Sequence, residues 1–99
     1  MKLVWSISQR KSGRPFDPAA DVDHYDLAMR VQGAPDYTPT AAQPAASATQ
    51  FDLDVTDVGV YEFRLICYPK TGSASAPAFA TAEVLDQSAP VIATFTATV

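Results

Sequence analysis

Carboxylates are the first candidates for chemistry in this chain, and seven of its 11 acidic residues fall into two clusters. Asp52, Asp54 and Asp57 lie close together, and closely spaced carboxylate oxygens suit a hard cation such as calcium. A second cluster lies around the single histidine and comprises Asp17, Asp21, Asp23 and Asp26. Because the glycine-centred loop of a high-affinity calcium site is absent, we interpret both clusters as solvated charges and predict no metal ion or cofactor.

His24 and Cys67 are the remaining candidates for catalysis. His24 stands beside Asp23 and Asp26, a pairing that occurs in catalytic and pH-sensing sites, but no motif places a nucleophile near it. Cys67 falls on the inward face of a predicted strand, where a buried, unreactive thiol is expected. One cysteine and one histidine form neither an intrachain disulfide nor a zinc site with four such ligands. The sequence therefore predicts a protein that is not an enzyme.

The cationic residues are concentrated near the start of the chain. Four of the seven precede every acidic residue, and these are Lys2, Arg10, Lys11 and Arg14. This positive end favours docking onto an acidic partner or onto the acidic surface of another copy, with Arg10, Lys11 and Arg14 as candidate contacts. A solvated loop is the alternative. The net charge of −4 argues against nucleic-acid binding, and no segment approaches the roughly 18 apolar residues of a membrane span.

Strands are the elements that the sequence predicts for positioning these residues. Apolar and polar residues alternate in six segments, and none shows the 3.6-residue period of a helix. The segments cover residues 2–8, 24–32, 51–56, 61–68, 78–85 and 91–99. A long loop over residues 9–23, a short edge strand near Tyr37 and a hairpin turn at residues 71–73 are predicted between them. The 99 residues thus indicate one all-β domain, whose predicted core comprises Trp5, Tyr25, Leu53, Tyr61 and Phe63.

The segment Val55–Phe63 carries a resemblance to a known family. It contains an apolar residue, a turn with Gly59 and then Tyr61. This pattern resembles the tyrosine corner of fibronectin type III domains, in which the ring packs in the core and the hydroxyl bonds to upstream backbone. The stretch is also similar to the Asp-x-Gly-x-Tyr-x-Cys signature of immunoglobulin domains, although Phe63 stands in place of the cysteine.

Three further features are similar to fibronectin type III domains in their order and spacing. Trp5 stands where the core tryptophan of the family's second strand stands, and residues 21–27 resemble the start of its third strand. Residues 73–78 are similar to the beginning of its last strand. The resemblance implies an immunoglobulin-like antiparallel β-sandwich over residues 1–86.

The chain departs from the family at both ends. Almost no residues precede the tryptophan strand, where the family has a first edge strand, whereas residues 87–99 add a C-terminal strand that resembles the missing one. The linker of residues 86–90 reaches about 17 Å, and the missing strand would begin roughly 25–30 Å away. We therefore expect exchange with a neighbouring subunit, with pairing beside the chain's own last strand or a flexible tail as alternatives. The expected interface residues are Val91, Ala93, Phe95, Ala97 and Val99.

These features predict a non-enzymatic structural or adhesion protein. The long polar loops after the tryptophan strand resemble those of phage tail and virion proteins, and no secretory signal is recognised at the start. We expect a location in a phage particle, as a capsid decoration or tail-associated protein, with other virion proteins and copies of itself as partners. The alternative is a secreted bacterial carbohydrate- or protein-binding module from a larger protein, which contacts polysaccharide or a host surface outside the cell.

Overall fold

The computed structural model describes all 99 residues and contains six strands and one short helix. The strands are β1 (Lys2–Val4), β2 (Val22–Val31), β3 (Thr38–Pro39), β4 (Gln50–Asp52), β5 (Gly59–Pro69) and β6 (Ala78–Val84), and the helix is α1 (Pro18–Asp21). The prediction of an all-β chain is confirmed. No helix of the structure has the length and hydrophobicity needed to cross a membrane.

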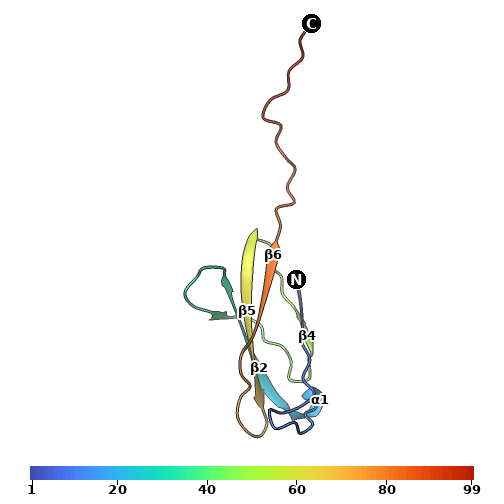
Figure 1. Ribbon diagram of the computed structural model, residues 1–99, viewed down its shortest axis with the longest axis vertical. Coiled ribbons are helices and arrows are strands. Elements are labelled where there is room, and N and C mark those ends of the chain that lie inside the picture. Colours follow the sequence, from blue (N-terminus) through green and yellow to red (C-terminus); the bar gives the residue numbers. More distant parts are fainter.

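The strands form two antiparallel sheets (Figure 1). β1 pairs with β4 in the smaller sheet, and the larger sheet has the order β3-β2-β5-β6. The ladder between β2 and β5 is the longest, and it runs from Val22 opposite Pro69 to Val31 opposite Tyr61. β3 pairs with β2 at the edge of the larger sheet, so the short edge strand predicted near Tyr37 is confirmed.

The core lies between the two sheets and is built largely from inward-facing residues of β2 and β5. Tyr25, Tyr61 and Phe63 are buried, as predicted, because alternate residues of a strand point to the same face. Trp5, directly after β1, meets Tyr25 edge-on, with ring centroids 5.2 Å apart. Trp5 and Leu53 are only half-buried, since each lines a cleft on the side of the smaller sheet.

Helix α1 lies within the segment predicted as a loop, so that prediction is wrong for residues 18–21. Asp17 caps the helix by accepting a hydrogen bond from the Ala19 N–H at 3.0 Å. Pro18 occupies the start of the helix, where its missing N–H is not needed. A four-residue helix is too short to show a 3.6-residue period, so the Asp-Pro pair is its only signal.

Two strands are shorter than predicted. β1 ends at Val4 rather than near Ser8, and β4 covers residues 50–52 rather than 51–56. β1 and β4 pair only with each other, so each has a neighbour along one edge alone. The other strands match the alternation more closely, because β2 and β5 are each paired on both sides.

Residues 85–99, which we call the tail, form no strand and extend from the end of β6 away from both sheets (Figure 1). The tail gives the molecule its longest dimension of 78 Å, against 26 and 24 Å for the other two. The prediction of a strand at residues 91–99 is therefore wrong for the single chain. A strand needs a neighbouring edge to pair its backbone N–H and C=O groups, and no edge lies beside the tail.

Candidate functional site

The tail exposes an apolar stripe. In extended backbone alternate residues share a face, so Thr94 and Thr96 lie opposite the apolar residues. Val91 and Phe95 are each 92% exposed, and five of the nine large apolar residues that the chain exposes belong to the tail. The five residues predicted as the interface are all exposed, and they are Val91, Ala93, Phe95, Ala97 and Val99. Contiguous exposed apolar surface is a feature that many interaction sites share.

An open groove lies between β1 and β6, and we call it the β1–β6 groove. It has a volume of about 330 Å³, and ten of its twelve lining residues are hydrophobic. Leu27, Phe63 and Leu65 of the larger sheet line it between its two sides, which are residues 2–5 and residues 78–82. The groove therefore reaches the inner, apolar face of the larger sheet.

Small side chains on β6 keep this groove open. Ala78 and Ala80 lie opposite Leu65 and Phe63 in the β5–β6 ladder, so they belong to the same inward face. Phe63 is buried, yet both alanines are exposed. The inner face of β6 thus meets no covering layer of the same chain.

The backbone edge of β1 that faces away from β4 has no neighbouring strand. Two hydrogen bonds join the smaller sheet just beyond its ladder, from Trp5 N–H to Thr49 C=O at 3.0 Å and from Leu53 N–H to Met1 C=O at 2.8 Å. Because residues of a strand point their backbone groups to alternate edges, those of Lys2 and Val4 point away from β4. This free edge borders the β1–β6 groove.

Tyr61 holds the loop at the end of the molecule from which the tail departs. Its buried hydroxyl donates a hydrogen bond to the Asp57 C=O at 2.9 Å, which is the bond to upstream backbone that the sequence predicts. Gly59 at the start of β5 pairs with Val84 at the end of β6. The bond therefore orders the backbone beside the base of the tail.

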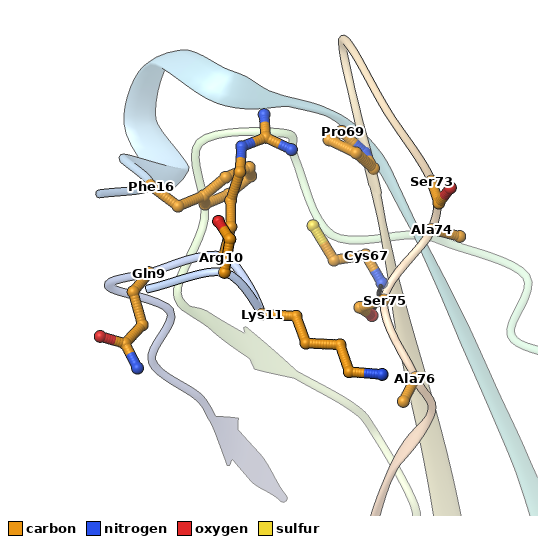
Figure 2. A pocket seen from close by; sticks show the side chains of 11 residues that line it. Gln9, Arg10, Lys11, Phe16, Cys67, Pro69, Ser73, Ala74, Ser75 and Ala76 are labelled. Atoms are coloured by element: carbon orange, nitrogen blue, oxygen red, sulfur yellow. Dashed lines mark hydrogen bonds between the residues drawn. The ribbon is translucent and has the colours of Figure 1, made fainter. Parts of the chain in front are cut away.

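Two of the three candidate docking cations line a second cleft, of about 460 Å³ (Figure 2). The Arg10 guanidinium lies 5.1 Å from the centroid of the Phe16 ring and donates a hydrogen bond to the Thr71 C=O at 3.2 Å. Figure 2 shows the Lys11 side chain extending toward Ser75. Arg14 does not line this cleft. Arg10 thus connects the loop after β1 to the β5–β6 hairpin. Its guanidinium already contacts Phe16 and Thr71, so only part of it is available to a partner.

Cys67 is buried in the wall of this second cleft, as predicted. Its N–H donates to the Ser75 hydroxyl at 2.9 Å, and its C=O accepts from the Ser75 N–H at 2.9 Å. Burial raises the pKa of the Cys67 thiol, an effect that the positive charge of Arg10 opposes. At neutral pH the thiol stays protonated, and a protonated thiol is a poor nucleophile.

The histidine and the aspartates do not converge on one site. His24 Nδ1 lies 2.6 Å from Asp23 Oδ2 on the exposed surface, and its ring stacks on Tyr68 at 4.5 Å between centroids. Asp26 faces Arg64 instead, at 3.9 Å. No three His, Cys, Asp or Glu side chains gather closely enough to hold a metal ion.

An aromatic group lies on the larger sheet around the Tyr37 ring. The Tyr37 ring lies 4.3 Å from the Arg30 guanidinium and 5.2 Å from that of Arg64. Phe79 of β6 lies 6.0 Å from Tyr37 between ring centroids and is 64% exposed. Because two arginines already contact the Tyr37 ring, Phe79 is the more accessible aromatic surface.

In comparisons with known proteins, no family model matches this chain, and no curated protein or solved structure matches it significantly. The resemblance to fibronectin type III domains therefore stays a prediction from the residues that carry it.

Sequence reasoning missed the β1–β6 groove, although one signal for it is present. Ala78, Ala80 and Ala82 alternate along one face of the β6 segment. A strand whose inward face begins with three alanines fills little volume there, and this pattern favours a gap beside it. The position of the gap depends on which strands meet, and no local pattern specifies that.

Proposed function

We propose that this chain is a non-enzymatic structural protein that assembles with copies of itself through residues 87–99. In this proposal residues 1–86 form an immunoglobulin-like sandwich of the fibronectin type III kind. The hydrogen bond from Tyr61 to the Asp57 C=O and the edge-on contact of Trp5 with Tyr25 support that assignment.

The exposed apolar stripe of the tail is the observation that carries the proposal. Burying a side chain such as Phe95 or Val91 stabilises a protein by about 1.5–3 kcal/mol, and within this chain the tail gains none of it. The alternation of apolar residues with threonines suits a strand with one buried face. Pairing with another chain supplies both the missing backbone neighbour and the missing apolar cover.

A phage particle is the setting that we propose for this assembly. A capsid decoration or tail-associated protein is present in many copies on a symmetric surface, where contacts between identical chains repeat. Arg10, Lys11 and Arg14 are the proposed docking residues for acidic surfaces of other virion proteins. Antibodies against the chain should then label purified particles at regular intervals in electron micrographs, and unlabelled particles would contradict this setting.

Sedimentation of the full chain over a range of concentrations tests the self-assembly. The wild-type chain should form multimers, and Phe95→Glu should remain monomeric because the charge falls on the apolar stripe. Thr96→Glu is the matched control, since it adds the same charge to the opposite face and should assemble like the wild type. A wild-type chain that stays monomeric, or a Phe95→Glu chain that assembles normally, would overturn the proposal.

A secreted carbohydrate- or protein-binding module is the second candidate function, and the exposed Phe79 beside Tyr37 is the observation that favours it. Aromatic faces stack on sugar rings, and one side of Phe79 is open to solvent. In a pull-down with insoluble polysaccharides, this function predicts retention of the wild-type chain and loss of retention for Phe79→Ala. Equal passage of both chains through the matrix would exclude it.

A further inference from the structure

We infer that the β1–β6 groove receives residues 91–99 of a second copy, which add a strand to the free edge of β1. The inference rests on the proposed self-assembly and identifies the surface that the tail occupies. The binding site is then incomplete in a single chain, because one molecule donates residues 91–99 and another supplies the groove that accepts them.

The chemistry of the groove matches the chemistry of residues 91–99. The groove is apolar, and the alanines of β6 that line it have small side chains. It therefore has room for larger side chains such as Phe95 and Val91 from a partner. The threonine face of the incoming segment would point to solvent. Its backbone would pair with the unpaired N–H and C=O groups of Lys2 and Val4.

The direction of the tail favours a neighbour over its own groove, where a reversal after β6 would pair the tail antiparallel to the free edge of β6 but parallel to β1. The N-terminus lies beside the end of β6, so β1 starts where β6 ends and the two strands run in opposite directions (Figure 1). The tail continues in the direction of β6. If a second copy is stacked on the same axis, the tail reaches the groove of that copy without reversing its direction and lies antiparallel to the copy's β1. Antiparallel pairs are slightly more stable than parallel ones.

Antiparallel insertion into the chain's own groove would require the tail to start from the opposite end of that groove. The seven residues of β6 separate the two ends by about 23 Å. Residues 85–90 span about 20 Å when fully stretched and would also need to reverse direction. The tail instead points away from both sheets.

The charges at the two ends of the molecule are partly complementary. The end that carries the base of the tail also carries four acidic residues in or beside β4, β5 and β6, which are Asp54, Asp57, Glu83 and Asp86. The opposite end carries four cations, because Arg10 bonds to the Thr71 C=O just beyond β5. These cations are Arg10, Lys11, Arg14 and Lys70.

Stacking along the long axis brings the acidic end of one copy toward the cationic end of the next. Asp17, Asp21 and Asp23 lie at the cationic end as well, and Lys2 and the Met1 ammonium lie at the acidic end, so the complementarity between the two ends is partial. Each copy then donates one strand and accepts one, so the interface is heterologous and the assembly is a ring or a filament.

Disulfide trapping in the full chain tests this placement. Val4 is 70% exposed on the outer face of β1, and an added strand would present its threonines on that same face. Val4→Cys is therefore combined in turn with Thr94→Cys, Thr96→Cys and Thr98→Cys, which covers the possible registers. The native Cys67 is buried and can be retained, and the parent chain measures its background reactivity.

Under oxidation we expect a ladder of covalent dimers, trimers and larger species with at least one of the three threonine positions. Val4→Cys with Ala97→Cys is the matched control, because position 97 faces the groove. At least about tenfold less dimer is expected from it, since cysteines that point to opposite faces cannot be bridged.

Three results would overturn the inference, and they separate its failure from that of the proposed function. A disulfide within the monomer would place the tail in its own groove. Absence of crosslinks at all three threonine positions, in a chain that still sediments as multimers, would place the tail on another surface and leave self-assembly standing. A chain that neither crosslinks nor forms multimers would remove both proposals.

Discussion

The backbone edge of β2 that faces away from β5 is covered by a side chain just beyond β3, whereas the free edge of β1 is uncovered. On the side of β2 away from β5, Leu27 donates its N–H to Gln43 Oε1 at 2.6 Å and accepts from Gln43 Nε2 at 2.9 Å. The Gln43 amide thus imitates a neighbouring strand just beyond β3. The edge of β1 has no such cover.

This difference indicates which edge is available to a partner. Uncovered edges are templates for pairing with other chains, and proteins usually block them with side chains, loops or short strands. In this chain the Gln43 amide covers the edge of β2, while the edge of β1 beside the β1–β6 groove stays uncovered. This contrast supports the proposal that the free edge of β1 is a binding surface.

Gln43→Ala gives the largest expected effect, because it removes the cover of β2. The Leu27 N–H would lose its partner, and the Leu27 C=O would keep only Thr40. We expect the free energy of unfolding to fall by about 1–3 kcal/mol, the cost of leaving a partly buried backbone group unpaired. Urea denaturation of Gln43→Ala against Gln32→Ala, an exposed glutamine, measures it. Equal midpoints for the two variants would show that water replaces the amide without cost.

Val4→Pro has the next largest effect and acts on the open edge. Proline removes the N–H that points away from β4, so the ladder within the chain keeps its bonds while an incoming strand loses one. Association should weaken by about tenfold or more, equivalent to about 1.4 kcal/mol, with little change in unfolding. Sedimentation equilibrium compares it with Val4→Ala, which retains the N–H. If both variants assemble with the same affinity, the edge of β1 is not the acceptor.

The same contrast explains how much of the fold could be predicted from the sequence. The strand around Tyr25 and the strand around Phe63 were predictable, because each alternation is matched by a partner within the chain. The alternation around Phe95 is as regular, but the segment forms no strand in a single chain. The pattern predicts a strand with one buried face, but it does not provide the strand that must pair with it.

The groove and the cover of β2 could not be predicted, because both depend on tertiary placement. Gln43 lies in an Ala/Pro/Thr stretch with no periodic signal, and its amide meets Leu27 only because the loop after β3 returns along β2. In the same way, alanines at positions 78 and 80 indicate low volume, but the gap exists because β1 stops short of covering them.

The smallest predicted effect is a pH dependence of the stability that comes from the core between the two sheets. The proposed pairing of residues 91–99 with the edge of β1 uses backbone N–H and C=O groups, which do not titrate, whereas Tyr25 of β2 and Cys67 of β5 are titratable groups in the core. Burial raises the pKa of the Cys67 thiol above its ordinary value of 9.0 and that of the Tyr25 hydroxyl above 10.0. The folded chain therefore holds both protons at a pH where the unfolded chain has released them.

Their contribution to stability is complete well below pH 9.0 and is lost as the pH rises through the folded-state values, because deprotonation favours the unfolded state. The melting temperature of the wild-type chain should fall between pH 8 and pH 11, and that of Cys67→Ala should fall less steeply, since only Tyr25 then contributes. Thermal melts of both chains across this range measure the two slopes. Parallel slopes would mean that the Cys67 thiol ionises as readily in the folded chain as in the unfolded one, despite its burial.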